Sequence, residues 1–199
     1  MPGIRELKKQ ETRQAIQLAA MKLFAEKGFE NTSLEDIGTA AGIGKTTVYG
    51  YFANKKDIFL NFCDEELEHE FSRLQGLNHS GKPLIELLVD FFMIKFSFMT
   101  RNHELGRQML REMIFPCEIN EKARNHDQRY FDIIEDFLKS AQDRGEISQK
   151  HDLFSLSIHF FSLYLGLLAG WYTGYLKSLP ETEDAMRKLF RQVIGGISA

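Results

Sequence analysis

The tripeptide Gly44-Lys45-Thr46 comes closest to recognisable chemistry in this sequence, because it matches the end of a phosphate-binding nucleotide loop. Such a loop needs a second glycine five residues earlier, so that successive backbone N–H groups surround the phosphates, and Thr39 stands there. The loop should also follow a buried strand, whereas Leu34, Ile37 and Ala41 recur at the spacing of one helix face. The pattern therefore favours a glycine-rich turn between two helices.

Motifs for enzyme catalysis are missing from the rest of the sequence. There is no HExxH, GxSxG or CxxC pattern, and the six His are scattered. His126 beside Asp127, or His159 within an apolar run, could join a metal or effector site, although a structural role is favoured for each histidine. We therefore expect no catalytic residues, no metal ligands and no cofactor.

The composition favours an all-α protein. Strong helix formers are plentiful, and the four Pro stand near apparent element boundaries, at positions 2, 83, 116 and 180. The chain of 199 residues is long enough for a sizeable core, which its seventeen Phe can help to fill.

Charge and cysteine content bear on partners and location. Residues 1–60 hold nine Lys or Arg against seven Asp or Glu, and residues 61–199 hold sixteen against twenty-one, so the two parts carry +2 and −5. This asymmetry permits a polyanion at the N-terminal end. Cys63 and Cys117 show no pairing pattern, and no signal peptide precedes the charged N-terminus, which favours the cytoplasm.

Three helices are expected in the first third of the chain. The first runs over about residues 11–27 and ends at Gly28; the second begins with Ser33 as N-cap and Asp36 as the acidic member of a capping box, and ends at Gly42. The third covers about residues 45–51, with Val48 and Phe52 directed inward. Two short helices joined by a glycine turn predict a helix-turn-helix, so the phosphates would be those of a DNA backbone.

Three stretches carry a more specific signal: residues 24–29 (FAEKGF), 32–37 (TSLEDI) and 41–58 (AGIGKTTVYGYFANKKDI). In this order they resemble the TetR family of transcriptional regulators. The resemblance implies a three-helix DNA-binding head at residues 1–56 and a larger helical domain at residues 57–199 for ligand binding and dimerisation.

Carried over position by position, the resemblance gives two sets of DNA contacts. Those with the major groove are Lys45, Thr46, Thr47 and Tyr49, and those with phosphates are Ser33, Tyr51 and Lys55. Either tyrosine could instead complete the small core. Gly44 stands where the family usually has a capping residue, and Gly50 where it commonly has a large one, so the third helix is expected to have a weak cap and a gap on its reading face.

The C-terminal region begins with an amphipathic helix toward residue 77, followed by a linker at residues 78–83 and helices near 84–99 and from 103. Phe and Met are dense there and could line a plastic apolar cavity, although core packing explains them as well. TetR-like proteins bind inducers in this domain, and on that basis we predict the following lining residues: Phe92, Phe96, Met99, Met113, Phe160, Tyr164 and Trp171.

A helix near residues 123–144 precedes the most ambiguous segment, 153–176, which contains no Asp, Glu, Lys or Arg. It could span a membrane, and Gly166, Gly170 and Gly174 repeat at the spacing of a helix contact in lipid. Polar residues interrupt the run and no basic cluster flanks it, so burial against the pocket and a partner subunit is favoured.

A last helix is expected over about residues 181–197. In TetR-like proteins the last two long helices form a four-helix dimer interface, which implies contacts by Gly166, Gly170, Leu189 and Val193. Two heads about 34 to 36 Å apart can bind a palindrome. The resulting hypothesis is a homodimeric, cytoplasmic repressor of a palindromic operator, released by a small apolar or amphipathic effector and not embedded in a membrane. The alternatives are a membrane-anchored DNA-binding sensor and a transcriptional activator.

Overall fold

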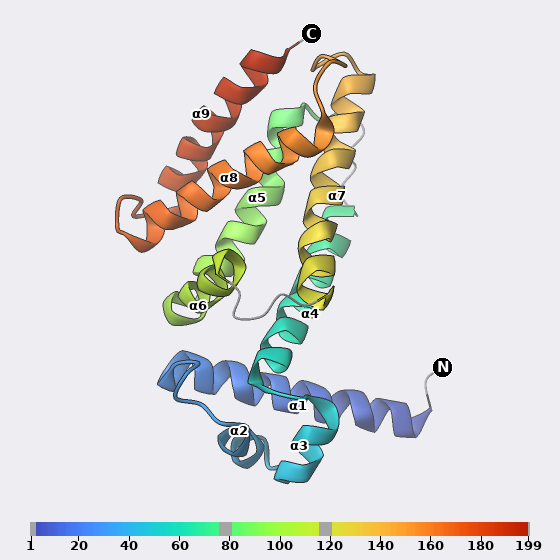
Figure 1. Ribbon diagram of the computed structural model, residues 1–199, viewed down its shortest axis with the longest axis vertical. Coiled ribbons are helices and arrows are strands. Elements are labelled where there is room, and N and C mark those ends of the chain that lie inside the picture. The colour runs from blue at the N-terminus through green and yellow to red at the C-terminus, as the bar shows by residue number, and fades with distance from the viewer. Residues whose placement is uncertain (1–2, 76–80, 116–120, 199) are drawn as a thin grey trace. The chain divides into compact units, whose positions relative to one another are not determined.

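The computed structural model describes residues 3–75, 81–115 and 121–198, and it confirms the all-α prediction for these ranges. An isolated antiparallel bridge joins Ile147 to Ser198. The helices, labelled in Figure 1, are α1 Ile4–Lys27, α2 Leu34–Ala41, α3 Lys45–Tyr51, α4 Lys55–Gln75, α5 Leu84–Thr100, α6 His103–Ile114, α7 Glu121–Asp143, α8 Leu153–Tyr172 and α9 Leu179–Ile197.

The chain forms two compact units. The first consists of Met1–Phe71 with Asn102–Met109, and the second of Ser72–Arg101 with Leu110–Ala199. Helices α4 and α6 therefore each contribute residues to both units. The division predicted after residue 56 concerns where the DNA-reading head ends, and it stays a prediction.

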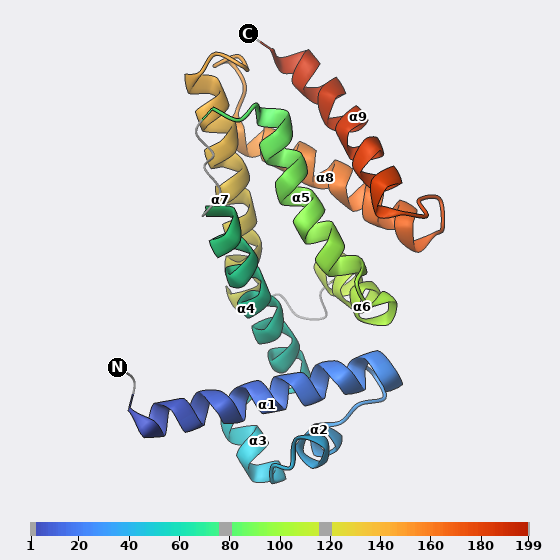
Figure 2. The same cartoon turned by 180° about the vertical axis from the view of Figure 1, so that it is seen from behind.

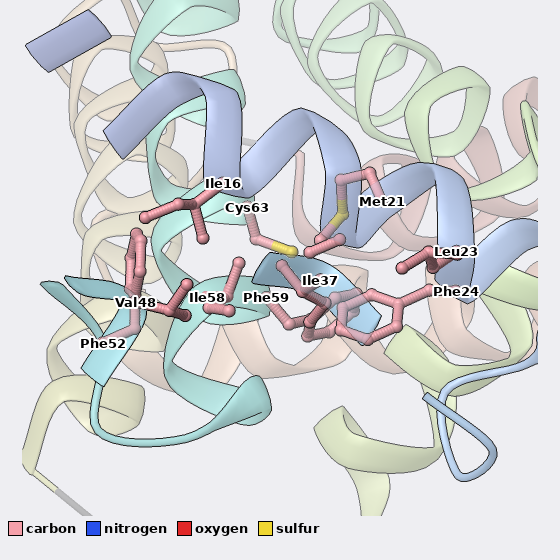
Figure 3. Packing of buried hydrophobic residues seen from close by; sticks show 11 residues of the cluster. Ile16, Met21, Leu23, Phe24, Ile37, Val48, Phe52, Ile58, Phe59 and Cys63 are labelled. Atoms are coloured by element: carbon pink, nitrogen blue, oxygen red, sulfur yellow. The ribbon is translucent and has the colours of Figure 1, made fainter. Parts of the chain in front are cut away.

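The first unit is built around one apolar core. Helices α2 and α3 lie on the same side of α1, and α2 packs against α1 and against α3 (Figure 1). Figure 3 shows side chains from α1, α2, α3 and α4 directed toward one another, and the rings of Phe24, Phe29 and Phe59 lie 4.8 to 6.4 Å apart. Leu105 and Met109 of α6 pack against the same core. Their distance in sequence from α1–α4 hid this contribution from pattern analysis.

Helix α1 begins at Ile4, not near residue 11 as predicted. Gly3 precedes it with extended backbone angles, and residues 4–10 are exposed on all sides. These first turns have no apolar stripe because they bury nothing in this chain, so the periodic pattern did not include them. Cys63 is buried in the core of this unit, and Cys117 lies outside the described residues.

The second unit contains a four-helix arrangement. Helix α5 packs against α7 and α9, and α8 packs against the same two helices, so the four close a ring of contacts (Figure 2). Their shared core is largely aromatic and includes Phe91, Phe92, Phe96, Phe160, Tyr164 and Phe190. An ion pair supports it from the side, because Arg187 of α9 donates to Glu86 of α5 at 2.8 Å.

Helix α8 ends at Tyr172, four residues before the end of the uncharged segment 153–176. Gly174 adopts a left-handed φ of 79°, and the N–H groups of Tyr175 and Leu176 both donate to the Gly170 carbonyl, which turns the chain back. By length and composition α8 could cross a membrane, with a mean hydropathy of 1.7 and 33% of the tested window buried. One such helix is weak evidence, since core helices of soluble proteins meet the same criterion.

Candidate nucleic-acid interface

The start of α2 is fixed by the predicted capping box. The Ser33 hydroxyl accepts from the Asp36 N–H at 3.1 Å, and the Asp36 carboxylate accepts from the Ser33 N–H at 3.0 Å and from its hydroxyl at 2.8 Å. The hydrogen bond from the Ser33 backbone, then that from its hydroxyl, lowers the pKa of Asp36. The capping box is confirmed, and it already engages the Ser33 hydroxyl that we predicted at phosphate.

The turn between α2 and α3 depends on two glycines. Gly42 takes the left-handed conformation, with φ 67° and ψ 28°, and the Ile43 N–H returns to the Gly38 carbonyl at 2.8 Å. A Cβ atom added at Gly38 would lie 2.8 Å from the Ile43 carbonyl oxygen and 3.3 Å from the Val48 side chain. Sequence reasoning missed Gly38; its position four residues before the turn glycine was the available signal.

Helix α3 is anchored as predicted. Val48 and Phe52 are 0% and 1% exposed and point into the core of the first unit (Figure 3). The opposite side of α3 is a continuous exposed surface made by Lys45, Thr46, Thr47, Tyr49 and Gly50. We call the four side chains of this surface, Lys45, Thr46, Thr47 and Tyr49, the α3 face. The N-cap Gly44 makes no side-chain hydrogen bond, which confirms the weak cap.

The predicted basic contacts already have partners within the chain. Lys45 forms an ion pair with Glu35 of α2, and this contact raises the pKa of Lys45. Lys55 donates to the carbonyls of Phe29 and Glu30 at 2.7 and 3.1 Å, and its ammonium lies 4.7 Å from the centre of the Phe29 ring. It therefore ties the start of α4 to the turn after α1. Its predicted phosphate contact stays a prediction.

The remaining predicted DNA residue, Tyr51, is half-buried against the core of the first unit. The guanidinium of Arg13 in α1 stacks over the next residue, Phe52, 5.5 Å from its ring centre. Arg13 also donates to Asn61 of α4 at 2.5 Å and pairs with Glu65 at 3.3 Å. This side chain joins α1, α4 and the end of α3. Sequence reasoning missed it because the two bonded residues are 48 positions apart.

Five of the seven predicted effector residues are buried in the core of the second unit. Phe92, Phe96, Phe160 and Tyr164 are 0% exposed, and Met99 is 4% exposed. The Tyr164 ring lies 5.1 Å from Phe92 and 6.4 Å from Phe96, which in turn lies 5.5 Å from the half-buried Trp171. Phe160 joins the group through Phe190 at 5.1 Å, whereas Met113 is half-buried on α6. Six of the seven residues thus belong to the described four-helix ring, and Met113 stands on another helix.

The predicted dimer residues differ in how the chain itself uses them. A Cβ added at Gly170 would meet Leu176 at 3.4 Å, so this glycine permits a contact inside the chain. Gly166 is exposed, and a Cβ there would meet nothing within 4 Å among the described residues. Leu189 and Val193 of α9 are half-buried. Gly166 is therefore the member of this set whose small size has no described use within one chain.

Known proteins match both the motif and the fold. A family model described as bacterial regulatory proteins of the tetR family matches residues 16–62, from α1 into α4. An HTH-type transcriptional regulator of Staphylococcus aureus is 30% identical over 141 residues, which cover 67% of this chain and 70% of that protein. The chain belongs to the TetR family. Proteins of the TetR family are DNA-binding regulators rather than enzymes.

Two further relatives of this TetR-family chain are matched over less of their length. A transcriptional regulator of Haemophilus influenzae is 34% identical over 116 residues, covering 56% of this chain and 55% of the relative. The regulator AcrR of Shigella flexneri is 33% identical over 144 residues, covering 65% and 64% respectively. The chain thus spans less than two thirds of the length of these two relatives.

Solved TetR-family structures confirm the fold, a helix-turn-helix head followed by a helical domain. Thermus thermophilus FadR, a repressor in complex with lauroyl-CoA, has a TM-score of 0.72 and 23% identity, covering 94% of this chain and 95% of its own. Bacillus subtilis FadR, in complex with stearoyl-CoA, has a TM-score of 0.76 and 21% identity, covering 92% and 98%. In the described residues of this TetR-family chain, no group of three or more His, Cys, Asp or Glu is placed to hold a metal ion.

Proposed function

We propose that this chain is a cytoplasmic repressor that binds a palindromic operator as a homodimer and is released by an apolar or amphipathic effector. The observation that carries the proposal is the α3 face, where four side chains able to contact DNA stand exposed on a helix anchored by Val48 and Phe52. Rigid anchoring is what a reading helix needs, because base edges are recognised by geometry.

Each residue of the α3 face has a chemical role in this proposal. Lys45 donates to guanine O6 or N7, or to phosphate, after leaving Glu35. The methyl groups of Thr46 and Thr47 pack on thymine methyls, and the Tyr49 hydroxyl donates to a phosphate or a base edge. Gly50 leaves a gap in this surface, so the operator differs from those read by relatives with a large residue there.

The outer surface of α8 supports a homodimer. Phe154 and Ile158 are 48% and 41% exposed, and Ser162 and Gly166 continue the same stripe at four-residue spacing without a charge. Two large apolar side chains exposed on one uncharged stripe are costly in water, and a second copy of α8 and α9 would cover them. The same stripe is the observation that keeps the membrane-anchored sensor as an alternative, which a monodisperse dimer in detergent-free buffer would exclude.

Release by an effector follows from the continuity of α4. This helix begins at Lys55, beside the end of α3, and continues into residues of the second unit. The Arg13–Asn61 bond joins its first turns to α1. An effector that binds more tightly to one head spacing than to another will shift the dimer toward that spacing and change its affinity for the operator. The lauroyl-CoA and stearoyl-CoA bound to the two FadR proteins favour an effector with a long acyl chain.

Selection of genomic DNA fragments by the purified chain at two salt concentrations tests this function. Specific complexes survive the higher salt concentration, whereas binding to phosphates alone weakens steeply. The proposal predicts an inverted repeat whose half-sites are about one helical turn apart. Salt-sensitive binding without a common motif would contradict it. Genes beside the recovered sites, assayed with and without the protein, distinguish repression from activation.

A further inference from the structure

A lysine is buried inside the aromatic core of the second unit. Lys95 of α5 is 6% exposed, and its ammonium lies 3.0 Å from the centre of the Tyr130 ring, 4.9 Å from that of Phe161 and 5.5 Å from that of Tyr164. Lysine is seldom buried to this extent, and the faces of aromatic rings attract a cation. A lysine ammonium therefore lies among the residues predicted to surround an effector.

The cluster also contains a tyrosine hydroxyl that has no hydrogen-bond partner among the described residues. It belongs to Tyr164 of α8, which is 0% exposed. A buried donor without a partner destabilises a fold, so its presence calls for a function. Burial, and to a lesser degree the neighbouring Tyr172, raises the pKa of Tyr164 well above its ordinary value. The hydroxyl therefore stays protonated at neutral pH and is available as a donor.

The rings around these two groups suit the apolar part of a ligand. Phe92 and Phe96 of α5 contact the Tyr164 ring. Trp171, which follows Tyr164 by seven residues on α8, lies against Phe96. Phe161, whose ring centre is 6.0 Å from that of Tyr164, is half-buried, so this side of the cluster is partly exposed. A charged and hydrogen-bonding end thus adjoins an aromatic surface, which is the chemistry of an amphipathic carboxylate.

We infer that the Lys95 ammonium and the Tyr164 hydroxyl bind the carboxylate of an amphipathic effector, whose apolar tail lies among Phe92, Phe96 and Trp171. This inference rests on the proposed function, in which the second unit receives the effector. One compact cation and one neutral donor match the single charge and two oxygens of a carboxylate. A phosphate dianion would call for more positive charge. The site distinguishes a free acid from an alcohol or an ester with the same tail.

The experiment compares dodecanoate with 1-dodecanol, which share a tail and differ in the head group. Trp171 is the sole tryptophan of the chain and lies 5.5 Å from Phe96, so its fluorescence reports binding. The full-length protein is titrated with each probe, together with the variants Lys95→Met, which keeps the length of the side chain, and Tyr164→Phe, which removes the hydroxyl. Lys139→Met, at an exposed lysine of α7, is the matched control for loss of one charge.

The unmodified protein is expected to bind dodecanoate about tenfold or more tightly than 1-dodecanol, as a charge-assisted contact provides. Lys95→Met abolishes this preference, Tyr164→Phe reduces it, and Lys139→Met keeps it. Equal affinity of the unmodified protein for the two probes would overturn the inference, as would a preference kept by both site variants. If Lys95→Met does not fold, Tyr164→Phe decides, because it fills the same space and removes a donor that has no described partner.

The outcome is separable from that of the proposed function. A chain that selects a palindrome but does not prefer dodecanoate refutes the carboxylate site and keeps the regulator. A chain that prefers dodecanoate through Lys95 and Tyr164, yet selects no DNA sequence, refutes the regulator and keeps the site. When both hold, dodecanoate releases the unmodified protein from its operator at lower concentration than 1-dodecanol does.

Discussion

The substitution Gly38→Ala tests how closely α2 and α3 must approach each other. The added methyl carbon would lie 2.8 Å from the Ile43 carbonyl oxygen, a backbone atom that cannot move without changing the turn, and 3.3 Å from the Val48 side chain. Gly50→Ala is the matched control, because a Cβ at that position of α3 meets nothing within 4 Å. Both glycines lie within helices, and neither has a positive φ.

The two substitutions should change local stability in opposite directions. Replacing Gly by Ala inside a helix stabilises it by about 0.5–1 kcal/mol, and this gain applies at both positions. At Gly38 it is opposed by overpacking, which costs about 1–3 kcal/mol. Because the helix gain cancels when the variants are compared, the difference between them is the overpacking cost itself. We expect Gly38→Ala to destabilise the motif and Gly50→Ala to stabilise it.

Amide hydrogen exchange measures this difference without assuming that the two units unfold together. The Val48 N–H, which donates to the Gly44 carbonyl at 3.1 Å, reports opening of α3. A difference of about 1–3 kcal/mol corresponds to about 5- to 150-fold in exchange rate, with Gly38→Ala exchanging faster than Gly50→Ala. Equal protection of Val48 in the two variants would refute the close approach of α2 to the turn.

Three further predictions concern the cap, the α3 face and the dimer. The pKa of Asp36 is lower in the folded chain than its ordinary value of 3.8, so its contribution to stability is complete above that pH and is lost as the pH falls through the folded pKa. Asp36→Asn should flatten this part of an acid titration of helix content. An unchanged titration would contradict the capping role. Glu35→Gln frees Lys45 and removes a carboxylate that repels phosphate. DNA affinity should therefore rise at low salt, and the gain should shrink at high salt. A loss of affinity would instead show that the ion pair positions α3 for binding. Ile158→Asp places a charge on the exposed stripe of α8 and should convert dimer to monomer in sedimentation equilibrium with helix content kept; a dimer of unchanged stability would place the interface elsewhere.

The helix-turn-helix was predictable because its signals are local. Ser33 and Asp36 mark the start of α2 within four residues, Gly42 marks its end, and Val48 and Phe52 share one side of α3 at i and i+4. These patterns depend on backbone geometry within one or two turns, which the sequence specifies directly.

Contacts between distant segments were not predictable in the same way. Lys55 reads as a surface lysine in sequence, but its ammonium bonds carbonyls 25 and 26 residues away. Lys95 interrupts an apolar helix and would be expected to reach solvent, yet rings from α7 and α8 enclose it. The tight space at Gly38 also arises only when the turn folds back on α2. Each of these depends on how helices pack rather than on the periodicity of one segment.

The salt dependence of operator binding by Lys45→Ala is the most direct test of the claim that the α3 face binds DNA. The control is Lys150→Ala, which removes the same charge from an exposed position outside the helices. If Lys45 contacts a phosphate, its loss makes the fall of log affinity with log salt less steep, by about 1 per head. If Lys45 contacts a guanine, its loss relaxes specificity at one base pair instead. If the α3 face binds DNA, Lys45→Ala shows one of these changes and Lys150→Ala shows neither. Operator affinity, salt slope and sequence preference that all remain unchanged in Lys45→Ala would contradict it.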